Sequence, residues 1–323
     1  MNQRRPLVLA LGSILSGHAA LLRAQTPAAS LRRVGVLAPR CRAKEEVTLK
    51  PFFDQMRDLG WIEGQNIAYD RVYADDQQQM LPRLAAELVA HKPDLIYAPP
   101  LPAAMAAKQA TQTIPIVGVV PDLVGIGLVA SLARPGGNVT GISNIGASLA
   151  LKRVELLREI LPGAKRLGLL GVPTDPVAKI EQQTLALPAA SLGLTIIVAE
   201  VVHPIDFDAA VARLVAERLD AIYLLESALT FNMRSQVVET ANRKRVPVID
   251  GGPGSLFYYS AAQADRLRRA AFLVDKVLKG AKPADLPVEQ PTLFELVVNV
   301  KVANALGITI PRSVLLRADW VIE

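Results

Sequence analysis

Charged and polar side chains follow several short apolar segments that have the pattern of buried strands. These candidates are Arg40, Asp122, Thr174, Asp175, Glu226, Ser227 and Asp250, joined by Pro100 and Leu101 in one such loop and by Asn144 in mid-chain. A guanidinium group can bind a carboxylate through two parallel hydrogen bonds, while carboxylates and hydroxyls bind polar groups of a ligand. These residue types indicate binding of a small polar or charged molecule.

The same residues also fit structural roles, as helix caps or as solvated loop residues. Thr174 and Asp175 directly precede a predicted helix, so capping and ligand binding are equal alternatives. Arg40 could clamp a carboxylate, but the nearby basic residues fit a solvated loop equally well. Glu226 and Asp250 end predicted strands, and this position favours a role in ligand binding.

Histidine and cysteine are too sparse for chemistry based on imidazole or thiolate groups. The three histidines, His18, His91 and His203, lie far apart, and Cys41 is the single cysteine. This distribution argues against a metal site and against a disulfide framework. The segment 125–130 fits the GxGxxG/A dinucleotide motif, but it does not follow the first strand and no acidic residue stands about 20 positions on. We expect no catalytic residues, no metal and no cofactor.

The formal net charge of +6 arises partly in the first 24 residues. They contain three of the 36 basic residues and none of the 30 acidic ones, so the rest of the chain carries +3. A charge of this size, without a basic tail, describes an ordinary surface. We expect no nucleic-acid partner.

Residues 1–24 have the pattern of a secretory signal peptide. Arg4 and Arg5 precede an apolar stretch from Leu7 to Leu22, and Ala24 is the best residue to precede the cleaved bond. Twin-arginine export is an alternative to the general secretory route, and an uncleaved membrane anchor is a further alternative. A lone cysteine is compatible with an oxidising compartment. The pattern predicts export to the periplasm as a soluble protein.

The rest of the chain reads as two copies of one unit. Strand patterns at 33–38 and 166–171 are each followed by a helical stretch that ends in Leu-Gly, then by a strand, an amphipathic helix and further strand–helix pairs. Such alternation predicts an α/β fold of two similar doubly wound parallel-sheet lobes, joined by more than one hinge crossing. A single continuous sheet is the alternative. The expected boundaries are 31–142 plus about 261–283 for lobe one, and 143–260 plus about 284–323 for lobe two.

Five segments carry longer patterns: LGWIEGQNI at 59–67, AAMAAKQAT at 103–111, GLVASLARPGGNVTG at 127–141, DKVLKGAKPADLPVEQP at 275–291 and ADWVIE at 318–323. In these segments the chain resembles the tryptophan/tyrosine-type family of ABC-transporter substrate-binding proteins. The resemblance implies a type I periplasmic-binding-protein fold. It also implies capture of a small molecule, such as an amino acid or an aromatic or carboxylate compound, and its delivery to an ABC permease in the inner membrane.

We expect the protein to be a monomer. Two other functions are alternatives to solute binding for an ABC permease: a periplasmic protein that senses a ligand and reports to a membrane receptor, and a small-molecule enzyme. A regulator that binds DNA is disfavoured, because an export leader stands where its DNA-binding module would be needed.

Three loops depart from the family pattern. Pro99–Pro102 replaces a Thr/Ser-Gly-Gly-Thr loop, Pro121–Leu123 replaces Gly-Asp-Pro, and the segment 251–255 is several residues shorter than usual. Ligands of open α/β sheets bind at the carboxyl ends of the strands, where these loops lie. The fold is expected to tolerate the changes, whereas the family's ligand preference is open.

Overall fold

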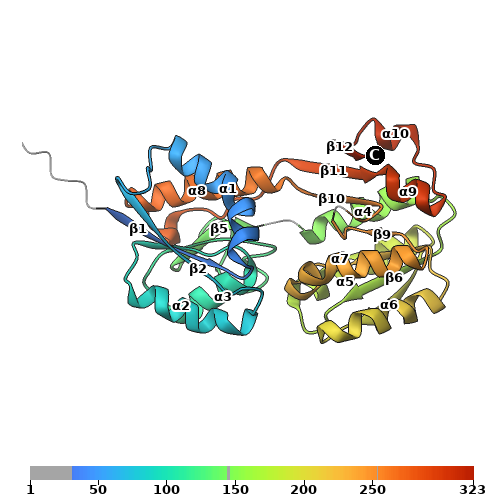
Figure 1. Cartoon of the computed structure of the whole chain (residues 1–323), viewed down its shortest axis with the longest axis horizontal. Coiled ribbons are helices and arrows are strands. Elements are labelled where there is room, and N and C mark those ends of the chain that lie inside the picture. Colours follow the sequence, from blue (N-terminus) through green and yellow to red (C-terminus); the bar gives the residue numbers. More distant parts are fainter. Residues whose placement is uncertain (1–30, 144–145, 253) are drawn as a thin grey trace, which may run out of the picture. The chain divides into compact units, whose positions relative to one another are not determined.

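The computed structural model describes residues 31–143, 146–252 and 254–323, so the predicted signal peptide lies outside the described residues. Two sheets organise this part of the chain (Figure 1). Each sheet and the helices packed on it form one lobe, which confirms the predicted two-lobed α/β fold. Within the described residues, no helix combines the length and the apolar character needed to span a membrane.

The first lobe is built on a five-stranded parallel sheet with helices on both faces. Its strands are β1 (Arg32–Ala38), β2 (Ile67–Tyr73), β3 (Leu95–Tyr97), β4 (Ile116–Val120) and β5 (Val139–Ser143). Its helices are α1 (Arg42–Asp58), η1 (Gln78–Met80), α2 (Leu81–Ala90), α3 (Leu101–Ala110), α8 (Gln263–Leu278) and η3 (Pro283–Asp285). α1 and α8 cover one face, where Phe52, Met56 and Leu267 pack on the strands, while α2 and α3 cover the other.

The second lobe is built on a seven-stranded sheet. Its strands are β6 (Arg166–Gly171), β7 (Thr195–Glu200), β8 (Ala221–Leu224), β9 (Val248–Ile249), β10 (Phe257–Ala261), β11 (Phe294–Asn299) and β12 (Trp320–Ile322). Its helices are α4 (Gly146–Ile160), α5 (Pro176–Ser191), η2 (Pro204–Asp206), α6 (Phe207–Ala216), α7 (Ala228–Arg243), α9 (Val300–Leu306) and α10 (Arg312–Leu315). α4 and α5 pack on one face, and α6 and α7 pack on the other.

The predicted internal repeat has a counterpart in strand order. The first sheet runs β2-β1-β3-β4-β5, and the second contains the corresponding order β7-β6-β8-β9-β10. In both sheets the chain direction across the sheet reverses beside the first strand of the repeat. The loops that follow β1 and β3 therefore diverge, as do those that follow β6 and β8, and each pair leaves a crevice where ligands of such sheets bind.

Two features of the C-terminal part differ from a purely parallel repeat. Helix α8 returns to the first lobe and lies beside α1 (Figure 1, orange beside blue). The chain then follows β5, where Glu289 exchanges backbone hydrogen bonds with Gly141 and Ser143, before it enters β11. Because it re-enters the second sheet at the end where β10 left it, β11 runs antiparallel to β10, with Phe294 opposite Ala261.

The family-like segment 127–141 has a scaffolding role in the first lobe. The side-chain amide of Asn138 donates to the carbonyl oxygens of Thr111 and Ile114, and its Oδ1 accepts a hydrogen bond from Lys108. A Cβ at Gly141 would lie 2.0 Å from the carbonyl oxygen of Gly118 on the neighbouring strand, so only glycine fits there. The segment therefore holds β5, the edge strand of the first sheet, in place.

Candidate functional site

A pocket of about 180 Å³ lies at the carboxyl ends of strands from both sheets. The first lobe contributes the loops after β1 and β3, parts of α1, and the end of β4; the second contributes the loops after β6 and β8 and the start of α7. Six of the expected residues line this pocket: Arg40, Pro100, Leu101, Asp175, Glu226 and Ser227. The loops that carry these residues follow strands next to the two crevices that the strand order creates. The topology of the two sheets therefore explains why the loops come together at one pocket.

Arg40 is held in a fixed position and is not part of a solvated basic loop. Its Nε donates to the carboxylate of Glu45 at 2.9 Å, and its Nη2 donates to the hydroxyl of Thr48 at 2.6 Å. Glu45 is buried, with 3% of its surface exposed, so Arg40 neutralises an acid on the pocket wall. The guanidinium group also lies 5.6 Å from the ring centroid of Phe231 on α7.

The proline loop 99–102 forms an apolar wall of the pocket. Pro100 is the N-cap of α3, Leu101 is its first residue, and Pro102 is within its first turn. Proline has no backbone N–H, so this helix start presents fewer donors than a glycine loop would present. The departure from the family pattern therefore alters the pocket directly.

Asp175 and Ser227 combine capping with a place on the pocket wall. Asp175 caps α5 by accepting hydrogen bonds from the backbone N–H groups of Val177 and Ala178. Burial raises the pKa of the Asp175 carboxyl, and these two hydrogen bonds partly oppose the effect. Ser227 caps α7 in a reciprocal arrangement with Thr230. The two alternatives for Asp175 are thus compatible in this structure.

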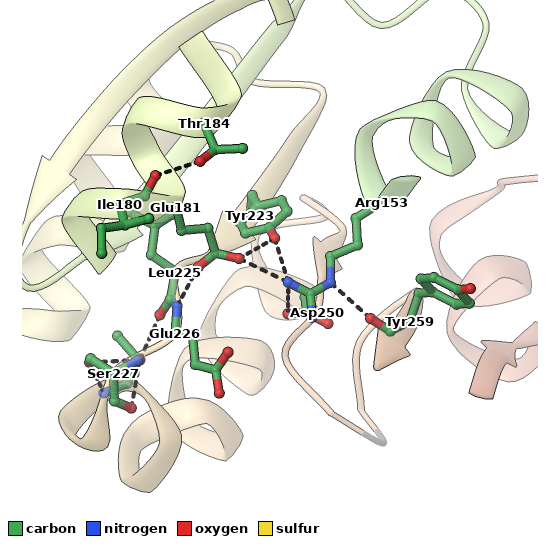
Figure 2. Close-up of polar contacts among 11 residues, drawn as sticks. Arg153, Ile180, Glu181, Thr184, Tyr223, Leu225, Glu226, Ser227, Asp250 and Tyr259 are labelled. Atoms are coloured by element: carbon green, nitrogen blue, oxygen red, sulfur yellow. Dashed lines mark hydrogen bonds and ion pairs between the residues drawn. The ribbon is translucent and has the colours of Figure 1, made fainter. Parts of the chain in front are cut away.

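Glu226 is positioned by a buried polar network of the second lobe (Figure 2). Its backbone N–H donates to Glu181 at 2.8 Å, while its carboxylate makes none of the contacts drawn in the network. At the centre, Arg153 Nη1 contacts Glu181 at 2.8 Å and Asp250 at 3.1 Å, and its Nε donates to the carbonyl oxygen of Tyr259. The hydroxyl of Tyr223 donates to Glu181 at 2.5 Å. The network links the carboxyl ends of β8 and β9 to helices α4 and α5, and it thereby positions the pocket loop that follows β8.

Asp250 serves this network and is not among the pocket-lining residues. It adopts a left-handed backbone conformation, with a φ of 60°, which turns the chain after β9. Burial raises the pKa of the Asp250 carboxyl well above its usual range, although Arg153 opposes the rise. Burial likewise raises the pKa of Glu181. Asp250 and Glu181 share the single cation Arg153, so this cation only partly offsets the free-energy cost of burying two carboxylates.

The other expected residues lie elsewhere. Asp122 closes a turn, where its carboxylate accepts hydrogen bonds from the backbone N–H groups of Val124 and Gly125. Thr174 is exposed and does not line the pocket. Asn144 lies outside the described residues. Of the three altered loops, the one after β4 reaches the pocket through Pro121 alone, and the described residues of the third, 251–252 and 254–255, do not line it.

Several pocket residues were missed by the sequence analysis. Phe231 and Asn232 come from the first turns of α7, Glu45 from α1, Val119 from β4, and Gln263, Arg266 and Leu267 from α8. Most of the helical residues gave no separate signal, because each fits an ordinary amphipathic helix. Arg266 could have been singled out weakly from the sequence, because a cation near the N-terminus of a helix is disfavoured by the helix dipole and so needs another reason to be there.

The pocket joins apolar surface to opposite charges. Apolar contact is offered by Leu101, Val119, Phe231 and Leu267 together with the prolines, while Arg266 and Glu226 supply a cation and an anion. Such a lining suits an organic molecule with an apolar body and charged groups. Within the described ranges, no group of three or more histidine, cysteine or acidic side chains is arranged to hold a metal ion.

Comparisons with known proteins agree with this architecture. The family model described as ABC transporter substrate binding protein matches residues 41–322. A tyrosine-binding protein of Clostridioides difficile is 30% identical over 264 residues, which cover 80% of this chain and 75% of that protein. A conserved domain protein from Vibrio cholerae has a TM-score of 0.82 at 30% identity, covering 90% of this chain and 99% of the other.

A second solved structure is an ABC domain from Streptococcus pneumonia in complex with L-Trp. It has a TM-score of 0.82 at 28% identity and covers 91% of this chain and all of the other. The family match spans both lobes and all of the pocket-lining residues except Pro39 and Arg40. The chain belongs to the ABC transporter substrate-binding protein family.

Proposed function

We propose that the protein is the exported solute-binding component of an ABC importer. It captures an aromatic amino acid or a related carboxylate between its two lobes and delivers the molecule to an inner-membrane permease. The observation that carries the proposal is the pocket at the strand ends of both lobes, where an apolar wall meets Arg266 and Glu226.

The charge pattern and the relatives support this class of ligand. A zwitterion presents a carboxylate and an ammonium group, which are complementary to a guanidinium and to a carboxylate. Phe231 supplies an aromatic face, and aromatic pairs are favourable beyond their buried area. One relative is a tyrosine-binding protein, and another was solved with L-Trp.

In this proposal the protein acts as a monomer that binds its ligand without converting it chemically. The residues that line the pocket include no histidine or cysteine, and its acids and arginines are accounted for by capping, ion pairing and binding. Calorimetry with L-tryptophan should give a one-site isotherm, and the amino acid should be recovered unchanged after prolonged incubation.

Native mass spectrometry of protein purified without refolding tests the ligand class most directly. The expected spectrum contains a complex whose released molecule is an amino acid or an aromatic carboxylate. Release of a sugar, together with no detectable binding of aromatic amino acids, would refute the proposal.

A further inference from the structure

Arg266 occupies an unusual position on the wall of the pocket. It lies in the N-terminal part of α8, between the pocket residues Gln263 and Leu267, where the positive end of the helix dipole disfavours a cation. Helix α8 belongs to the first lobe, so Arg266 lines the pocket from that lobe, whereas Glu226 and Ser227 line it from the second.

The guanidinium group of Arg266 lacks a counter-ion among the described residues. Its Nε is buried without a hydrogen-bond partner. Glu226 and Glu295 act on it electrostatically, but neither lies within ion-pair distance. Burial lowers the pKa of Arg266, which shows that the loss of water outweighs the attraction of these two acids.

A second donor is unsatisfied in the same region. The hydroxyl of Tyr97, at the end of β3, is buried without a partner and interacts electrostatically with Arg266. Buried donors normally have partners, and a buried unpaired cation is costly. Arg266 lines the pocket, whereas Tyr97 lies in the core next to it, so the unpaired donor that faces the pocket is the guanidinium group, whose missing partner would be an anion.

Two other cations near the pocket are already paired with acids. Arg40 is paired with Glu45, and Lys44 is paired with Asp76. Arg234 lines an adjoining pocket of about 670 Å³, with its guanidinium 4.1 Å from the ring centroid of Phe231. The proline loop removes backbone donors at the start of α3, so it leaves a ligand anion to be met by a side chain.

We propose that Arg266 is the residue that binds the anionic group of the ligand and thereby selects carboxylates over their neutral analogues. This inference rests on the proposed function, because it assigns the carboxylate end of the captured molecule to a specific side chain. The apolar body then lies against Phe231 and the proline loop.

Calorimetry with matched pairs of compounds tests the assignment. The pairs are L-tryptophan with L-tryptophanamide and indole-3-acetate with indole-3-acetamide, and the variants are Arg266→Gln and Arg268→Gln. Arg268 is exposed on the same helix and does not line the pocket, so it controls for loss of charge on α8. The wild type and Arg268→Gln should prefer each acid roughly 10- to 100-fold, and Arg266→Gln should lose most of that preference.

Stability separates a binding role from a structural one. Removal of a half-buried cation whose Nε is unpaired relieves a desolvation cost, so the ligand-free Tm of Arg266→Gln should equal or exceed that of the wild type. If that variant fails to fold, Arg266→Lys retains the charge without the planar fork and should weaken the acid preference.

The outcomes distinguish this inference from the proposed function. Binding of L-tryptophan with an acid preference that survives in Arg266→Gln would overturn the role of Arg266 and leave the proposed function standing. Absence of any acid-over-amide preference in the wild type would also overturn it. Acid preference for indole-3-acetate that depends on Arg266, without binding of any amino acid, would support the inference while the amino-acid class fails.

Discussion

Phe231 is the aromatic side chain on the pocket wall whose removal should disturb binding without disturbing the fold. It is 42% exposed, and its ring lies under the guanidinium groups of Arg40 and Arg234. Phe231→Ala should weaken L-tryptophan binding by about 0.5–1.5 kcal/mol, roughly two- to twelvefold, because an aromatic contact is lost. Calorimetry measures the difference.

The matched control is Phe272→Ala on α8, since Phe272 has the same 42% exposure and lies outside the pocket. It should bind L-tryptophan as the wild type does. Equal affinities of the wild type and Phe231→Ala would remove the aromatic wall from the proposed site.

Asp250 should make stability depend on pH. Its folded-state pKa is raised above the ordinary value of about 4, so the folded protein holds the proton more readily than the unfolded chain. The free energy of unfolding therefore falls as the pH rises from about 4 towards the raised pKa. Asp250→Asn removes this titration, and asparagine tolerates the left-handed backbone.

Thermal melts between pH 4 and pH 8 measure the effect. The Tm of Asp250→Asn should decline less steeply with rising pH than that of the wild type, and Glu181 should account for a remaining slope. An exposed control, Asp285→Asn, should follow the wild-type profile. Parallel profiles for all three proteins would contradict a raised pKa at Asp250.

The candidate residues show which parts of a site can be predicted from sequence. Arg40, Asp175 and Glu226 were predicted as site residues because they follow strands, and they line the pocket because chain topology gathers strand ends whatever the side chains are. Asp250 also follows a strand, but its left-handed backbone conformation accompanies a carboxylate paired with Arg153, which is 97 positions away. Such pairing is tertiary and leaves no local pattern.

At the scale of single elements, the start of α3 determines how many backbone donors face the pocket. Replacement of Pro99 and Pro100 by glycine restores two N–H groups at this loop. Binding of a carboxylate should then tighten by about 1 kcal/mol, if one ordinary hydrogen bond is gained. The Tm should fall, because glycine increases the conformational entropy of the unfolded chain.

Calorimetry well below the Tm decides the question, with the amide analogue as the control. The gain should appear for the acid and not for the amide. Equal or weaker binding of the acid, with an unchanged circular dichroism spectrum, would show that these prolines do not limit anion binding.

The elements themselves were largely predictable, since apolar periodicity and glycine at helix ends mark their bounds. The strands expected at residues 33–38 and 166–171 are observed at 32–38 and 166–171, and the repeat shared by the two lobes has the same strand order. The antiparallel direction of β11 was not predicted, because it depends on where the chain re-enters the sheet. The family-like segment 127–141 identified the scaffold and not the pocket, to which it contributes no residue.

For the molecule as a whole, we predict that the leader is removed during the proposed export. Residues 1–24 combine a basic start, an apolar stretch and small residues near Ala24. N-terminal sequencing of protein recovered from the periplasm should begin near Gln25. Periplasmic material that began at Met1 would contradict cleavage, and material retained in the membrane would favour the uncleaved anchor.

The return of α8 to the first lobe has a consequence for synthesis on the ribosome. The helix begins about 120 residues after β5 ends, yet it covers the face of the first sheet that holds Phe52 and Met56. Until residue 278 has been made, that apolar face lacks one of its two covering helices, and the lobe gains only part of its hydrophobic stabilisation. Contacts so distant in sequence also form slowly. Under the proposed export by the general secretory route, late completion of the first lobe favours an unfolded chain, which is the form that this route transports.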